Sequence, residues 1–298
     1  MEKIKNMTRR DFLKDAAYTT FAVSAGFSLK IPEKYKWKKE TKVVLIRDEK
    51  VIDDNDTVNM KIISKMLDEG ISRLFDVKNP LDAWKELFKP EYLVGIKTNV
   101  WSYLHTPKEL EEAIRMRVIK AGVKEKNVAI QDRGILRNKI FMNAGALINV
   151  RPMRTHHWSG VGTCLKNYIM FVPRPSAYHG DACANLGAIW HLPRVKGKTK
   201  LNILVLLRPL FYGVGPHHFS RKYSWYYKGM IIGTEPATVD AVGLHILKLK
   251  RDRYFGEEKP FTPPPKHIFV ADKKYNLGIT DFKKIDIIKL GWEKDSLI

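Results

Sequence analysis

Short β-branched runs that alternate with amphipathic segments are the feature that most restricts the fold of this 298-residue chain. The first run, Lys42–Arg47, has the continuous apolar pattern of a buried strand. Apolar residues at helical spacing then fill Met60–Phe75, and Pro107 opens another helical segment that stops at Gly122. This alternation predicts an α/β fold with a mostly parallel or mixed central sheet and helices on both of its faces.

The same patterns predict six more strands and one long helix. The helix runs over Glu235–Phe255, with Thr234 as its N-cap and Gly256 as its stop. Strands are predicted at Tyr92–Lys97, Asn127–Asp132, Leu201–Leu207, Met230–Gly233, His267–Ala271 and Ile285–Lys289.

Residues 134–226 do not alternate in this way. They form a long irregular middle segment rich in His, Trp, Tyr, Gly and Pro. Functional residues are often found on irregular segments that a rigid scaffold carries, so we expect one polar site here. The predicted organisation is a signal peptide at 1–25, a charged linker at 26–40 and a single α/β domain at 41–298.

The N-terminus contains the stretch TRRDFLK, in which Arg9 and Arg10 precede Phe12 and Leu13. A basic region comes before it, and a modest apolar run that ends in small residues comes after it. This run is too short and too polar to span a bilayer. The stretch resembles a twin-arginine export signal, which implies that the twin-arginine translocase carries the folded protein to the periplasm or otherwise outside the cytoplasmic membrane.

The charge balance is strongly basic. Lysine and arginine number 53 against 32 acidic residues, a formal net charge of +21, and residues 1–25 account for two of these charges, so +19 belongs to the rest. This favours anionic partners, either a small anionic ligand or an anionic membrane surface. An aromatic cluster at Tyr223–Tyr227 lies among basic residues, but nucleic acid is not a predicted partner of an exported protein, and we expect a membrane-facing or core patch.

Five stretches then occur in a fixed order: VGIKTNVW, GVGTCLKN, YHGDAC, YGVGP and IIGTEPATVD. With them, the chain resembles the family called domain of unknown function 362 over about residues 40–295. The resemblance implies little biochemistry. Some members of that family carry a four-cysteine iron–sulfur module, but this chain has only Cys164 and Cys183 and no C-x-x-C pair, so no iron–sulfur cluster is predicted.

Two Lys/Asn motifs predict an anion site. Lys97 ends a predicted strand, and in open α/β sheets ligands bind outside the carboxyl ends of the strands. Glycine turns allow backbone N–H groups to approach an anion, and the helix that starts after Gly233 offers a positive dipole end. Neither glycine turn completes a dinucleotide fingerprint. The candidate anion-binding residues are Lys97, Asn99, Lys166, Asn167, Gly162 and Gly215.

Six of the nine histidines fall in the middle segment, and neutral imidazole suits zinc or iron. Adjacent histidines on a regular strand point to opposite faces, so one member of each pair would face a site. The alternative is that these are ordinary polar histidines in aromatic-rich loops. The candidate ligands of one transition metal are His156, His157, His179, His217 and His218. His179 and Asp181 are the candidate catalytic groups, and Asp132 and Asp240 are further acid–base candidates.

The leading functional hypothesis is therefore an exported enzyme, dependent on a metal or cofactor, that acts on a small anionic substrate. The alternative is a non-catalytic cell-envelope protein that binds anionic lipid or polymer through its basic surface. Because a twin-arginine passenger folds in a reducing compartment, Cys164 and Cys183 are expected to be free thiols in the precursor.

Replacing Arg9 and Arg10 by lysine tests the predicted export route. The translocase reads the arginine pair, so the variant should accumulate in the cytoplasm as unprocessed precursor. Cell fractionation followed by immunoblotting measures this. Export of the variant at the normal level would show that the N-terminal motif has been misread.

Overall fold

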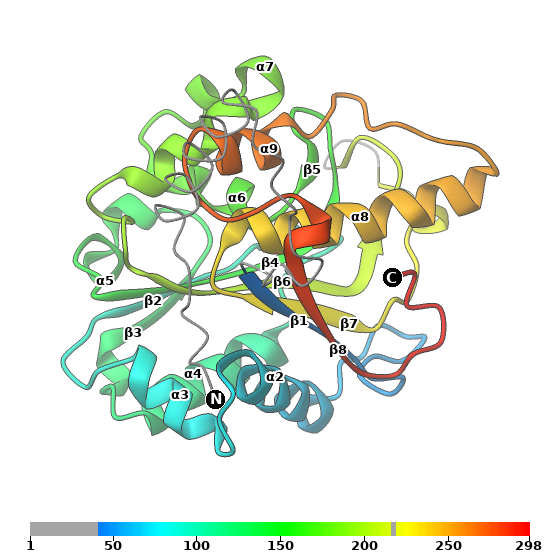
Figure 1. Cartoon of the computed structure of the whole chain (residues 1–298). Helices are drawn as coiled ribbons and strands as arrows, with labels where there is room; N and C mark the ends of the chain where they lie inside the picture. Colours follow the sequence, from blue (N-terminus) through cyan, green and yellow to red (C-terminus); the bar gives the residue numbers. More distant parts are fainter. Residues whose placement is uncertain (1–40, 216–218) are drawn as a thin grey trace, which may run out of the picture. The chain divides into compact units, whose positions relative to one another are not determined.

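The computed structural model describes residues 41–215 and 219–298 (Figure 1). The export motif with Arg9 and Arg10, and the histidines His217 and His218, lie outside the described residues. The described strands form one mixed sheet in the order β3-β2-β4-β6-β7-β1-β8, with the short β5 paired to β4. The strands are β1 (Thr41–Arg47), β2 (Val94–Lys97), β3 (Val128–Gln131), β4 (Ala146–His156), β5 (Gly160–Gly162), β6 (Thr199–Leu210), β7 (Gly229–Gly233) and β8 (Ile285–Gly291).

Strand β7 runs against its two neighbours, β6 and β1. The other neighbouring pairs along this path are parallel, so the carboxyl ends of β2, β3, β4 and β6 meet at one edge of the sheet. In the sheet register Lys97 pairs with Asn149, and Asn149 pairs with Asn202. Asn202 pairs in turn with Gly233, so the end of β7 lies at the level of Lys97 with β4 and β6 between them. The helix N-terminus predicted to help bind an anion after Gly233 is therefore two strands away from Lys97 and does not adjoin it.

Helices cover both faces of the sheet (Figure 1). In β1, Val44 and Ile46 pack in the core on the side of α2, whereas Val43 and Leu45 pack in the core on the side of α8. The predicted α/β architecture is therefore confirmed. The helices are α2 (Met60–Phe75), α3 (Pro80–Leu87), α4 (Lys108–Lys120), α5 (Lys139–Met142), α6 (Cys164–Asn167), α7 (Gly180–Cys183), α8 (Pro236–Phe255) and α9 (Lys266–Lys273).

Helix α8 matches its predicted range, and Gly256 ends it in the left-handed conformation with φ +72°. Its N-cap is Glu235 rather than Thr234. The aromatic cluster that precedes it is largely part of the core, because Tyr227 is fully buried and Trp225 packs against Phe211. No helix in the described ranges is both long and apolar enough to span a membrane.

Two secondary-structure predictions were wrong. The segment predicted as a strand at His267–Ala271 is helix α9, whose buried residues His267, Ile268 and Ala271 follow helical spacing. A short apolar run does not distinguish a strand from a helix by pattern alone. Strand β4 lies inside the segment read as irregular, because the buried polar residues Asn149 and Arg151 interrupt its apolar pattern.

Candidate functional site

Lys97 lies at the carboxyl end of β2 and is completely buried. Its Nζ donates to Oδ1 of Asp132 at 2.5 Å, to the carbonyl of Thr98 at 2.6 Å and to Oδ1 of Asn167 at 3.3 Å. These three acceptors use all three protons of the ammonium group. Lys97, predicted to bind an anion directly, therefore has its donors engaged within the protein.

Burial lowers the pKa of Lys97 to about 8, although the negative charge of Asp132 opposes this shift. Burial also acts to raise the pKa of Asp132, but the ion pair with Lys97 outweighs it, and the pKa of this carboxyl is lowered. Asp132, considered as an acid–base candidate, is the partner that neutralises Lys97.

A chain of asparagines crosses the sheet from this ion pair. The Nδ2 of Asn167 donates to Oδ1 of Asn149 at 2.8 Å and to the carbonyl of Lys97 at 3.2 Å. Asn149 donates in turn to Oδ1 of Asn202 at 3.0 Å, and Asn202 donates to the carbonyl of Thr234 at 3.0 Å. Asn167 thus ties α6 to β2 and β4 and does not project freely toward a ligand.

Asp240 of α8 fixes the beginning of α6. Its carboxylate accepts from the backbone N–H of Cys164 and of Leu165, both at 2.8 Å, and from Oγ1 of Thr163 at 2.6 Å. Burial raises the pKa of Asp240 to about 7. These bonds satisfy N–H groups that a helix start leaves unpaired, so this acid–base candidate orients Lys166 and Asn167.

Three other basic side chains meet at this edge of the sheet, and we call Arg151, Arg154 and Lys166 the cation site. Each is at most 4% exposed. Within the described residues, none of the three forms an ion pair with a carboxylate, in contrast to Lys97. Nε and Nη1 of Arg154 and Nε of Arg151 are buried without a hydrogen-bond partner in this part of the chain.

The charges of the cation site act on one another. Burial lowers the pKa of Lys166 to about 8; the contact with Cys183 opposes this shift, and the nearby charges of Arg151 and Arg154 add to it. Burial and then repulsion by Arg151 hold the pKa of Arg154 well below its usual range. The guanidinium of Arg154 lies 4.3 Å from the ring centroid of Trp101, a cation–π contact that replaces only part of its lost hydration.

The predicted glycines make room for this arrangement. A Cβ at Gly162 would lie 2.7 Å from Nη2 of Arg151, so the missing side chain admits the guanidinium. Gly215 has φ +66°, and a Cβ there would lie 2.5 Å from the carbonyl of Thr155. Asn99 is also buried here, with its backbone N–H donating to Oγ1 of Thr106 at 3.0 Å.

The histidines of the middle segment form a stack with Trp158. The rings of His156 and His157 lie 4.8 Å apart and nearly parallel, so these neighbours share one side. The prediction that adjacent histidines point to opposite faces is wrong for this pair, because His156 is the last residue of β4 and the chain turns after it. The Trp158 ring contacts the ring of His157 at 4.1 Å and that of His179 at 3.7 Å.

The imidazoles of His156 and His179 are kept neutral. Burial, followed by the charge of Lys166, lowers the pKa of His179 to about 4, and burial with Arg154 lowers that of His156 further. Asp181 pairs with Lys266 at 2.5 Å on the exposed surface. Within the described ranges, no group of three or more His, Cys, Asp or Glu side chains is arranged to hold a metal ion. His217 and His218 are not described, so the metal site stays a prediction.

A turn of unusual conformation lies next to this stack. Asp181, Ala182 and Cys183 all have positive φ, at 47°, 53° and 61°. Such left-handed residues cost roughly 1–2 kcal/mol each for side chains other than glycine. The turn brings Sγ of Cys183 to 3.5 Å from the carbonyl of Trp158. Both Cys183 and Cys164 are buried free thiols.

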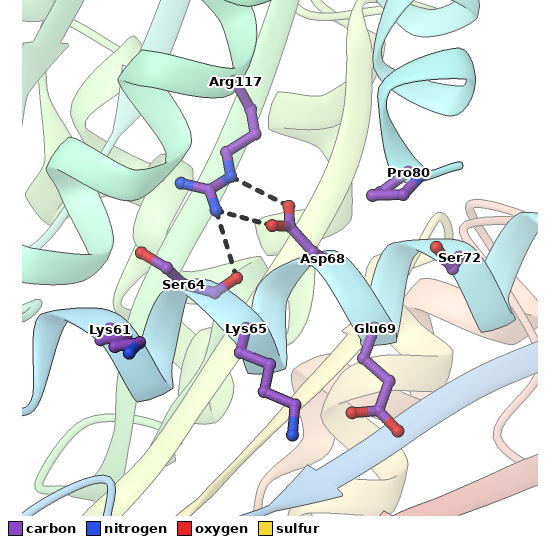
Figure 2. Close-up of a pocket in the computed structure, with 8 residues that line it drawn as sticks. All are labelled: Lys61, Ser64, Lys65, Asp68, Glu69, Ser72, Pro80 and Arg117. Atoms are coloured by element: carbon purple, nitrogen blue, oxygen red, sulfur yellow. Dashed lines mark hydrogen bonds and ion pairs between the residues drawn. The ribbon is translucent and has the colours of Figure 1, made fainter. Parts of the chain in front are cut away.

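Two surface hollows lie elsewhere. The larger, of about 540 Å³, lies beside α2, where Arg117 forms a bidentate ion pair with Asp68 (Figure 2). The smaller, of about 220 Å³, lies at the carboxyl edge and is lined in part by Tyr103, Pro152 and Arg208. The guanidinium beside the larger hollow is already paired with a carboxylate. The cation site has no carboxylate partner in the described part of the chain, so it is the better candidate for binding an anion.

No protein-family model matches the chain, and no curated protein or solved structure matches it significantly. The resemblance to domain of unknown function 362 therefore stays a prediction.

The sequence reasoning found Lys166 but missed Arg151 and Arg154. The available signal was their position: both arginines lie in the stretch ALINVRPMRTH, between apolar residues typical of a strand. Arginine is seldom buried without a partner, so a charged residue inside such a run indicates a functional site.

The Asp240→Ala variant tests how the site is anchored. It leaves two N–H groups of α6 and the hydroxyl of the preceding Thr163 without this acceptor, so the free energy of unfolding should fall by about 3 kcal/mol or more. Urea denaturation measures the loss. The control is Asp252→Ala in the same helix, where the carboxylate is partly exposed and pairs with Lys248; its loss should be much smaller. Equal losses in the two variants would contradict the anchoring role.

Proposed function

We propose that the protein binds a small anionic ligand, through a phosphate or carboxylate group, in the cation site. The observation that carries the proposal is Arg154, which is buried, lacks a carboxylate partner among the described residues and has two guanidinium nitrogens without hydrogen bonds. A buried charge in this state is costly unless a partner of opposite charge compensates it.

The chemistry of the site favours an oxyanion. A guanidinium presents planar pairs of N–H donors that match the two oxygens of a carboxylate or phosphate. Arg151 and Arg154 come from one strand, β4, and Lys166 comes from α6, so donors from two elements serve the same small region. The anion would also relieve the mutual repulsion that lowers the pKa of Lys166.

The proposed function also includes a catalytic role and a place outside the cytoplasm. We propose that the ligand is the substrate of an exported enzyme, in which the neutral His179 and the ammonium of Lys166 are positioned to accept or donate a proton near the bound anion. Export by the twin-arginine route fits an internal site, because a folded passenger would carry its binding site complete.

The alternative is binding to an anionic membrane through surface charge. The cations of the proposed site are too deeply buried to touch a planar layer of head groups. Membrane binding would therefore depend on exposed lysines and not on Arg154, and this difference separates the two hypotheses experimentally.

The Arg154→Met variant tests anion binding in two ways. Without ligand, removal of an unpaired buried charge should leave the fold equally stable or stabilise it by about 1–3 kcal/mol. Calorimetric titration with sulfate should show an affinity at least tenfold weaker than that of the wild type, with a smaller rise in melting temperature.

Arg253→Met is the matched control, since it removes the same charge from a side chain that is 62% exposed. It should bind sulfate as the wild type does. If both variants lost affinity equally, net surface charge and not the cation site would bind the anion. If the wild type bound no sulfate or phosphate, the proposed function would fail.

The pH dependence of sulfate binding supplies an independent test. Lys166 has a pKa of about 8, so it loses its charge as the pH rises through this value. Sulfate affinity should therefore fall between about pH 7 and pH 9.5, because sulfate itself does not titrate in this range. The Lys166→Arg variant should flatten the profile, because a guanidinium keeps its proton there. A flat profile for the wild type would contradict the role of Lys166.

A further inference from the structure

Large apolar side chains are exposed around the carboxyl edge of the sheet. Val100 and Tyr103 follow β2, Trp158 follows β4 and Val214 follows β6. Their exposed fractions range from 38% to 54%. Together with Trp101, these four residues form what we call the aromatic rim. Several exposed apolar residues on the loops at one edge of a sheet are typical of a ligand-binding surface.

The rim is directly connected to the cation site. Trp101 covers the guanidinium of Arg154 at 4.3 Å, and the ring centroid of Trp158 lies 5.8 Å from Nζ of Lys166. Each of these two cations is therefore next to an indole ring. A ligand bound at either cation would therefore lie close to an indole ring.

The exposed rings are held in fixed positions. The backbone N–H of Trp158 donates to Nδ1 of His156 at 3.2 Å, its carbonyl accepts from Cys183, and its ring stacks on His179. Tyr103 stacks on Phe219 with ring centroids 4.7 Å apart. Exposed aromatic rings that are preorganised in this way lose little entropy when a flat group stacks on them.

We propose that the ligand is an aromatic anion, in which a ring stacks on the aromatic rim while its phosphate or carboxylate group enters the cation site. This inference rests on the proposed function, because it assigns the second part of the same ligand. A lipid surface fits less well, since the buried cations require a group that penetrates between the loops. Trp158 and Tyr103 remain 45% and 54% exposed beside their ring contacts, and an aliphatic anion would leave this aromatic surface uncovered.

Calorimetric titration with phenyl phosphate and methyl phosphate tests the inference, since these probes share the anionic group and differ in the ring. The wild type should bind phenyl phosphate about tenfold more tightly, the effect expected of one stacked ring. In Trp158→Ala this ratio should fall toward one while methyl phosphate still binds. Tyr103→Ala should lower the ratio as well. Phe269→Ala removes an aromatic ring that is 43% exposed on α9 and should leave the ratio unchanged.

The outcomes separate the two proposals. Equal affinities for the two probes in the wild type, or a ratio unchanged in both rim variants, would overturn the aromatic inference and leave anion binding in place. If neither probe nor sulfate bound, the proposed function itself would fail. If phosphatidylglycerol vesicles bound the protein and phenyl phosphate did not compete, the rim would be a lipid-facing surface and the inference would be wrong.

Discussion

The carboxylate of Asp240 is the contact on which the arrangement of the site depends. Helix α6 has four residues and could not persist alone, because so short a segment gains too few hydrogen bonds to offset the cost of nucleation. Asp240, on the long helix α8, accepts three hydrogen bonds at the start of α6. Helix α8 packs against the sheet through its buried residues. The position of Lys166 on α6 is therefore fixed, through Asp240, by the main core.

Neighbouring polar groups in this region differ in how fully they are hydrogen-bonded, and this difference indicates a ligand at the cation site. The fold gives Lys97 three acceptors, and it gives the amides of Asn149, Asn167 and Asn202 partners along a continuous chain. The same region leaves Nε and Nη1 of Arg154 without partners among the described residues. Because the fold provides three acceptors for Lys97, polar groups that could act as hydrogen-bond partners are present in this region. The unsatisfied guanidinium is better explained by a ligand than by imperfect packing, and this supports the proposal of an anion site.

The sequence predicted the fold better than the site, for physical reasons. Strands such as β1 and helices such as α2 have strong periodic patterns, because one side of each element must be apolar. The role of β4 was hidden, since Arg151 and Arg154 are polar residues at buried positions, and pattern reasoning assigns such residues to loops. The part played by Lys97 depends on Asp132, a residue 35 positions away that becomes its neighbour only when β2 and β3 pair.

The left-handed turn at Asp181–Cys183 fits the proposed ligand as well. Three successive residues with positive φ together cost several kcal/mol. The turn fixes the backbone of Trp158: Cys183 donates to the carbonyl of Trp158, and the N–H of Trp158 donates to His156. Backbone strain of this kind is typical of positions where geometry matters for binding. An exposed indole that only shielded the core would not need it, whereas an indole that stacks on a ligand ring would.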